Sequence, residues 1–142
     1  MSLSDPVAWL LLLSAAHLGF QLTVDLVVYP ALGEVGDEAW SRAHERHSSR
    51  ITPVVALVYP PLVAVLVWTA TAYAAEPGTW VAVAGAALAV LTTAAVAAPT
   101  HGRLATASAE ERPALLRRLD RADRVRTVGA VVCVVGALLL VG

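Results

Sequence analysis

The chain has 142 residues, of which 58% are hydrophobic and 15% are charged, and its mean hydropathy is +0.69. Soluble domains carry about a quarter charged residues, so this composition excludes an ordinary soluble globular protein. The length suits one domain covering residues 1–142. All ten basic residues are arginine, and the net charge of −1 gives no basic surplus of the kind that binds nucleic acid.

The stretch from Val7 to Tyr29 predicts the first membrane-spanning helix, because about 20 apolar residues cross a bilayer core. Asp5 suits an N-cap and Pro6 a first helical turn, and Pro30 is expected to stop the helix. The first residues lack the positive charge with which signal peptides begin, so we expect a helix that is retained.

This first helix carries three polar residues, His17, Gln21 and Asp25, spaced four apart. That spacing places them on one face of a helix, one turn above another. Ionisable side chains inside a membrane are costly unless they face protein or water. We therefore expect all three to face the interior of a helix bundle.

The second span is predicted from about Ile51 to Ala75, with Pro60 and Pro61 near its middle. Two adjacent prolines remove two backbone donors and predict a kink, which serves either packing or a functional opening. The preceding residues 31–50 are polar. They predict a short amphipathic helix from Asp37 to His47, either at the membrane interface or as an extension of the second span.

The third span is predicted from about Thr79 to Ala98, ending at Pro99, and the fourth from about Val125 to Val141. The long connection between them should become helical from Ser108, with acidic residues in its first turn, and run into the fourth span. The expected fold is therefore all-α, a bundle of four transmembrane helices. The four predicted helices form two helical hairpins, and in each hairpin an apolar helix ending in proline is followed by a helix that begins with arginine. This similarity indicates a weak internal repeat.

Arginine placement predicts the orientation in the membrane. All ten arginines fall in the two connections, 31–50 and 99–126, or at the helix entries beside them. In a four-span protein these connections share one side, which the positive-inside rule makes cytoplasmic, so both termini should lie outside. The arginines also predict contacts with anionic lipids. The bias toward alanine, arginine and valine favours a bacterial inner membrane.

The histidines and Asp25 predict a polar pocket that opens toward the cytoplasmic side. Histidine and carboxylate ligands suit iron, copper or zinc, and helix bundles build such sites from facing helices. The candidate metal ligands are His17, Asp25, His44, His47 and His101. The candidate catalytic residues are Asp25, His17 and Arg126. Gln21 and Arg50 are the groups expected to hold a cofactor or close the pocket.

Each candidate also has a structural interpretation. Asp25 could form an ion pair with Arg50 or Arg126, and His17 could be a neutral imidazole bonded to a neighbouring helix. His44 and His47 could belong to a solvated interfacial face. His101 could cap a helix C-terminus, where imidazoles meet the last carbonyls. Cys133, the single cysteine, is expected to be a small buried hydrophobe.

Two segments resemble a known family: Pro99-Thr-His-Gly-Arg-Leu104 and, further on, Asp123-Arg-Val-Arg-Thr127. Together they are similar to the small four-helix membrane proteins related to anthrone oxygenases. In that family an Asn-x-x-Arg element often opens the fourth helix; here Asp123 replaces the asparagine and Arg126 is the arginine. The resemblance implies a four-helix bundle with a polar inner pocket, and in some members oxygen chemistry on aromatic polyketides.

The sequence thus favours a small membrane enzyme, a metal-dependent oxygenase or redox protein acting on a small apolar or aromatic substrate. The alternative is a non-catalytic transporter subunit, assembly partner or homo-oligomer, suggested by small-residue faces that let membrane helices approach closely. These faces contain Gly85 and Ala89 in the third span and Gly129 and Gly136 in the fourth. A third interpretation, a proton or ion pathway, needs only His17 and Asp25.

Overall fold

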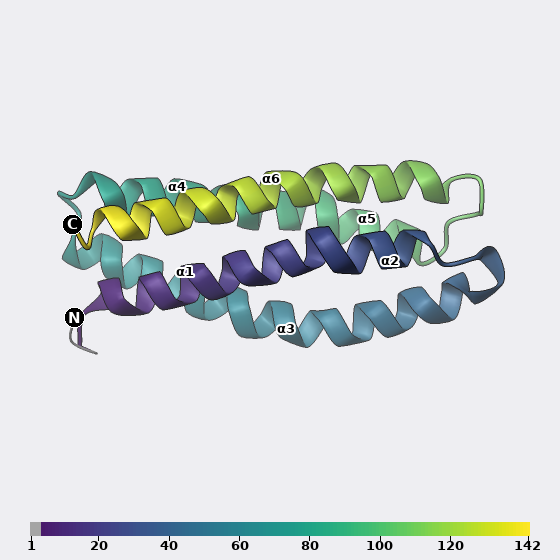
Figure 1. The fold of residues 1–142 in the computed structure, drawn as a ribbon, viewed down its shortest axis with the longest axis horizontal. Helices are drawn as coiled ribbons and strands as arrows, with labels where there is room; N and C mark the ends of the chain where they lie inside the picture. The colour runs from purple at the N-terminus through teal and green to yellow at the C-terminus, as the bar shows by residue number, and fades with distance from the viewer. Residues whose placement is uncertain (1–3) are drawn as a thin grey trace.

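The computed structural model describes residues 4–142, which form four helical rods lying side by side (Figure 1). The first rod joins α1 (Pro6–Thr23), η1 (Val24–Val28) and α2 (Tyr29–Gly33), and the second is α3 (Asp37–Ala72). The third rod joins α4 (Pro77–Thr92), η2 (Thr93–Ala97) and α5 (Ala98–Leu104), and the fourth is α6 (Arg112–Leu139). No strand occurs within residues 4–142, so the all-α prediction is confirmed there.

Three of the rods are long and apolar enough to cross a membrane: Pro6–Gly33, Asp37–Ala72 and Pro77–Leu104. Their outward faces carry many exposed large hydrophobic side chains, as expected where a surface meets lipid rather than water. The fourth rod, α6, has comparable length, but its first half carries arginines and aspartates. The structure therefore indicates a membrane protein with three apolar spans.

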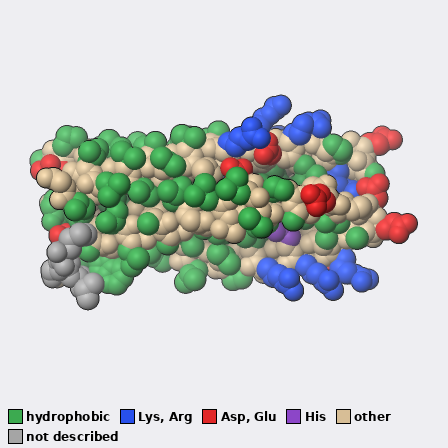
Figure 2. Space-filling view, viewed as in Figure 1, with side chains coloured by type: hydrophobic (Ala, Val, Ile, Leu, Met, Phe, Trp, Pro, Cys, Tyr) green, Lys and Arg blue, Asp and Glu red, His purple; other side chains and the backbone are tan. Residues whose placement is uncertain are grey.

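Both arginine-bearing segments lie at the same end of the bundle, as the sequence predicted. The termini and the turn between α3 and α4 occupy one end, and the 34–36 and 105–111 connections occupy the other (Figure 1). Arginines gather on two opposite edges near the second end, while hydrophobic side chains cover much of the remaining surface (Figure 2).

Two helix boundaries differ from the sequence prediction, since neither Pro30 nor Pro99 ends its helix. Each proline follows a five-residue π turn, η1 or η2, after which the helix continues. A proline clashes with the carbonyl four residues earlier, and in both rods that carbonyl lies inside the wider π turn. The helices therefore absorb their prolines, and the matching positions strengthen the resemblance between the two hairpins.

The connections also differ from the prediction. Residues 37–50 do not form a separate short helix: they begin α3, which runs on unbroken through Pro53, Pro60 and Pro61. The alternative of an N-terminal extension of the second span is the one observed. In the other connection, Ser108 and Glu111 make reciprocal hydrogen bonds, and the helix begins just after them at Arg112.

The small residues predicted to mediate association pack inside the chain. Gly85 and Gly129 lie against each other, and Gly136 lies against Ala82, so that α4 and α6 approach backbone to backbone. This contact uses the faces that suggested a homo-oligomer. Because these glycine faces are already occupied within one chain, they give no argument for association with a second copy of the protein.

Candidate functional site

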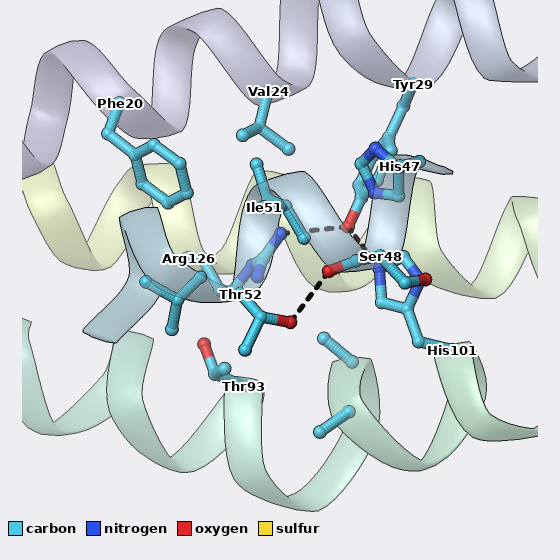
Figure 3. Close-up of a pocket in the computed structure, with 13 residues that line it drawn as sticks. Phe20, Val24, Tyr29, His47, Ser48, Ile51, Thr52, Thr93, His101 and Arg126 are labelled. Atoms are coloured by element: carbon cyan, nitrogen blue, oxygen red, sulfur yellow. Dashed lines mark hydrogen bonds between the residues drawn. The ribbon is translucent and has the colours of Figure 1, made fainter. Parts of the chain in front are cut away.

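A cavity of about 290 Å³ lies between the two π turns, near the arginine-bearing end of the bundle (Figure 3). All four rods contribute to it. Its lining is largely apolar, with a polar group at one side formed by Tyr29, His101 and Arg126. π turns often occur at functional sites, and here each contributes to the wall. The remaining lining residues are Phe20, Val24, His47, Ser48, Ile51, Thr52, Val55, Thr93, Ala97 and Ala98.

The polar side of the cavity is organised around the hydroxyl of Tyr29. Nη2 of Arg126 donates to this hydroxyl at 3.3 Å, and the same oxygen lies 3.1 Å from Nε2 of His101. A guanidinium can only donate. We therefore assign the Tyr29 hydrogen to the bond with Nε2 of His101, so that the neutral imidazole carries its own hydrogen on Nδ1.

Arg126 is held by Asp123, one turn earlier on α6. Nη2 of Arg126 donates to Oδ1 of Asp123, and the residues are 5% and 0% exposed. A buried charge needs a partner, and this pair supplies one within a single helix. The aspartate thereby holds the guanidinium at the cavity wall.

Three histidines lie together beside the cavity. The ring centroid of His101 is 5.5 Å from that of His47 and 5.8 Å from that of His44. His44 is buried and stacks on Trp40 at 5.4 Å, while the Trp40 indole donates to the carbonyl of Leu104. The prediction of a solvated face for His44 is therefore wrong, because Trp40 covers it.

A second polar group extends from Thr93 toward the middle of the bundle. The Thr93 hydroxyl donates to the carbonyl of Ala89, so its oxygen accepts from the Tyr59 hydroxyl at 3.1 Å. Tyr59 in turn accepts from Nε2 of Gln21 at 3.4 Å. His17 packs edge-on against the Tyr59 ring, with a centroid distance of 4.9 Å. Gln21 and His17 are fully buried, as predicted, and both lie outside the cavity wall.

His17 does not make the hydrogen bond that its structural interpretation required. Neither ring nitrogen of His17 has a partner among the described residues. His101 is likewise more than a C-terminal cap, because its Nε2 bonds to Tyr29 on another rod.

Asp25 does not line the cavity, although the sequence predicted a central role for it. It is partly exposed and is not part of the cavity wall. The π turn that begins at Val24 changes the register of the helix, so Val24 takes the inward position and the stripe ends at Gln21. The expectation that Asp25 faces the interior alongside His17 and Gln21 is corrected accordingly.

Neither predicted ion pair of Asp25 forms. Arg126 binds Asp123 instead, and Arg50 is exposed. Arg50 lines a shallow groove that it shares with His47, outside the cavity, so it does not close the pocket. Of the predicted residues, Arg126, His47 and His101 line the cavity, and His44 adjoins it.

The predicted metal ligands do not converge on one point. Within residues 4–142, no three histidine, cysteine or acidic side chains are placed to hold a metal ion. The ring of His47 stacks on that of His101 with an interplanar angle of 26°, and the ring of His44 is tilted by 31° to it. A metal held by histidines needs ring nitrogens about 2 Å from a shared centre. The side chains present therefore do not fit the predicted site.

Sequence reasoning missed Tyr29, Tyr59 and Thr93. The sequence placed Tyr29 at the end of the first predicted span, because Pro30 was expected to stop the helix, and gave it no role in the site. Tyr59 directly precedes the Pro60-Pro61 pair, and a tyrosine inside an apolar helix needs a partner for its hydroxyl. That requirement was the available signal for Tyr59, and the same reasoning applies to Thr93.

Comparison with known proteins finds no matching family model, no matching curated protein and no matching solved structure. The class of protein is therefore defined by the fold and the site alone. It is an all-helical protein with three apolar rods of membrane-spanning length. It has a small, mainly apolar cavity with a tyrosine, a histidine and an arginine on one side.

Proposed function

We propose that this chain is a four-span membrane protein of a bacterial inner membrane, with the arginine-bearing end in the cytoplasm and both termini outside. α6 supports a fourth span because it packs along α4 through glycine contacts. Arginines at the cytoplasmic end would reach lipid headgroups with their long side chains, and the two arginine edges suit anionic lipids.

We propose further that the protein is an enzyme acting on a small apolar or aromatic molecule that carries an acidic hydrogen, such as a phenol or an enolisable ketone. One observation carries this proposal: the Tyr29 hydroxyl lies in an apolar cavity between Arg126, which can only donate, and His101, which accepts. The cavity volume lies near the lower limit of ligand pockets, so the molecule is small.

The chemistry supported best is proton transfer. When His101 takes the Tyr29 hydrogen, the Arg126 guanidinium stabilises the phenolate that remains. This oxygen can then accept the acidic hydrogen of the bound molecule, which restores the tyrosine and leaves an anionic substrate beside Arg126. The apolar wall excludes water, so each of these charges interacts more strongly with its neighbours than it would in solution.

The resemblance to anthrone oxygenases remains a prediction. An apolar cavity beside an acid–base group suits an aromatic polyketide, and deprotonation makes such a molecule easier to oxidise. The histidines offer no support for the metal-dependent version, because no three possible ligands among residues 4–142 are placed to hold a metal ion. The alternative of a non-catalytic subunit loses its main motivation, because the small-residue faces are occupied within the chain.

The proposal can be tested with 2-naphthol, a phenol of suitable size whose anion has its own absorption spectrum. We expect saturable binding to the detergent-purified protein above the level of empty micelles, with part of the bound probe ionised. Naphthalene should bind about tenfold more weakly, because it lacks the hydrogen bond, worth about 1.4 kcal/mol.

Two tryptophan variants of neighbouring residues provide the control. Val55 lines the cavity, whereas Val54 is exposed on the outer face. Val55→Trp should abolish 2-naphthol binding, and Val54→Trp should leave it unchanged. Equal binding by these two variants, or no saturable binding by the wild type, would rule out the cavity as the site. A metal-free higher oligomer that binds no probe would favour the non-catalytic alternative.

A further inference from the structure

A second depression, most of whose lining residues carry a polar side chain, lies between α3 and α5. This groove has a volume of about 680 Å³ and is lined by hydroxyl-bearing residues of α3, by His44 and Glu45, and by Gly102. Three residues, His101, Ser48 and Thr52, line both the groove and the apolar cavity. The imidazole of His101 therefore belongs to the wall that separates a polar space from an apolar one.

The ring nitrogens around His101 show how the two spaces can communicate. Nε2 of His101 is bonded to Tyr29 on the cavity side, and its Nδ1 has no partner. Nε2 of His44 and Nε2 of His47 are also buried without a partner. An unpaired buried polar group destabilises a fold, so three of them close together need an explanation. Water is the simplest occupant, because a buried water needs two to four polar partners.

We propose that the groove between α3 and α5 is the aqueous entrance to the site, and that His101 passes protons between water in this groove and the Tyr29 hydroxyl. This inference rests on the proposed function, for which it supplies the path of the proton. His44 also lines the groove, with its ring centroid 5.8 Å from that of His101.

The transfer balances without any further reactant. The O–H bond of Tyr29 breaks as an N–H bond forms at Nε2 of His101. The N–H bond at Nδ1 breaks as its proton passes to water held among the histidines and then to the groove. Arg126, His44, His47 and Glu45 are the other charged or titratable groups lining the two spaces, and Arg126 offsets the charge left on Tyr29.

A glycine of α5 allows the groove to be filled without touching the cavity. Gly102 lines the groove but not the cavity, and a Cβ added there meets nothing within 4 Å. Gly33, in α2 at the same end of the bundle, is also exposed and equally open, but it lines neither space. Gly102→Trp is therefore the test variant, and Gly33→Trp is its matched control.

The measurement is the rate at which the His101 ring N–H exchanges with water, followed by NMR on protein labelled with ¹⁵N in its four histidines. We expect Gly102→Trp to slow this exchange by at least about tenfold, equivalent to about 1.4 kcal/mol of added opening free energy. Gly33→Trp should exchange like the wild type. Ala105→Trp, at another position lining the groove, should also slow exchange.

Two results would overturn the inference. One is unchanged exchange in both Gly102→Trp and Ala105→Trp. The other is exchange that slows in Val55→Trp instead, because water would then reach His101 through the cavity. The proposed function is judged separately by 2-naphthol binding, which Gly102→Trp should retain. If the wild type does not bind 2-naphthol, the proposed function is rejected. The exchange rates in Gly102→Trp and Ala105→Trp still decide whether water reaches His101 through the groove.

Discussion

The hydroxyl of Tyr29 lies 3.1 Å from Nε2 of His101, although 72 positions separate the two residues in the chain. This bond joins the end of the first rod to the end of the third. Tyr29 directly follows the π turn η1 and His101 lies four residues beyond the π turn η2, so each residue lies just past the irregular turn of its own rod. The contact that defines the site thus depends on the two irregular turns.

Tyr29→Phe tests what this hydroxyl contributes. The change leaves one Arg126 donor and the His101 acceptor unpaired in a mainly apolar wall, so we expect a loss of about 1–2 kcal/mol in the free energy of unfolding. Denaturant titration in detergent would measure it. The variant should also bind 2-naphthol without ionising it. Tyr73→Phe is a suitable control, since its hydroxyl bonds to Asp5 at the opposite end of the bundle. A Tyr29→Phe protein that still ionises the probe would remove tyrosine from the proposed chemistry.

The buried pair of Asp123 and Arg126 should be strongly coupled. Removing one partner leaves the other charge buried and unpaired, so Asp123→Asn and Arg126→Gln should each cost about 3–5 kcal/mol. The double variant should cost clearly less than the sum of the two. A double-mutant cycle of unfolding free energies measures this coupling. For comparison, the exposed pair of Asp120 and Arg124 should show at most about 1 kcal/mol. Additive effects at Asp123 and Arg126 would contradict the buried ion pair.

Alanine substitutions at two glycines should distinguish a closely packed position from an open one. A Cβ on Gly85 would collide with the backbone nitrogen of Cys133 and lie 2.6 Å from the carbonyl oxygen of Gly129. Gly85→Ala should therefore destabilise the protein by about 1–3 kcal/mol, because α4 and α6 must move apart. At Gly19 an added Cβ meets nothing, so Gly19→Ala should be neutral or stabilise by up to about 1 kcal/mol. Thermal unfolding of the two variants side by side gives the comparison, and equal stabilities would contradict the observed packing.

Glu111 predicts a local pH dependence in the 105–111 connection. The backbone N–H of Ser108, and then its hydroxyl, hold the pKa of the Glu111 carboxyl below its usual range. A lowered pKa in the folded state means that this contact stabilises the structure above the unfolded pKa. The stabilisation is lost as the pH falls through the folded pKa. The protection factor of the Ser108 amide, which is the exchange rate of an unstructured amide at the same pH divided by its own, should fall across that acidic range in the wild type. In Glu111→Gln the amide should show no such transition.

Much of the helical architecture could be predicted from the local sequence, whereas the arrangement of the site could not. The apolar runs predicted the rods, and the arginines predicted which ends lie together, because both depend on composition over many residues. The positions of Asp25 and Tyr29 depended on how each helix accommodates its proline. One inserted π turn moved Asp25 away from the interior and brought Tyr29 to His101, and no periodicity of 3.6 residues anticipates such a shift.

The all-helical, mainly apolar character of the chain and the burial of His17 and Gln21 follow from the amino-acid sequence, because unpartnered polar groups are excluded from lipid. The packing of the rods against one another selected the partners of the polar and small residues. It paired Arg126 with Asp123 rather than Asp25, and it used the glycine faces inside the chain rather than between copies. The physical reason is that such contacts depend on the rotation of each helix about its axis and on approach distances of an ångström or less. These are set when the rods pack together, and the sequence of any single rod does not contain them.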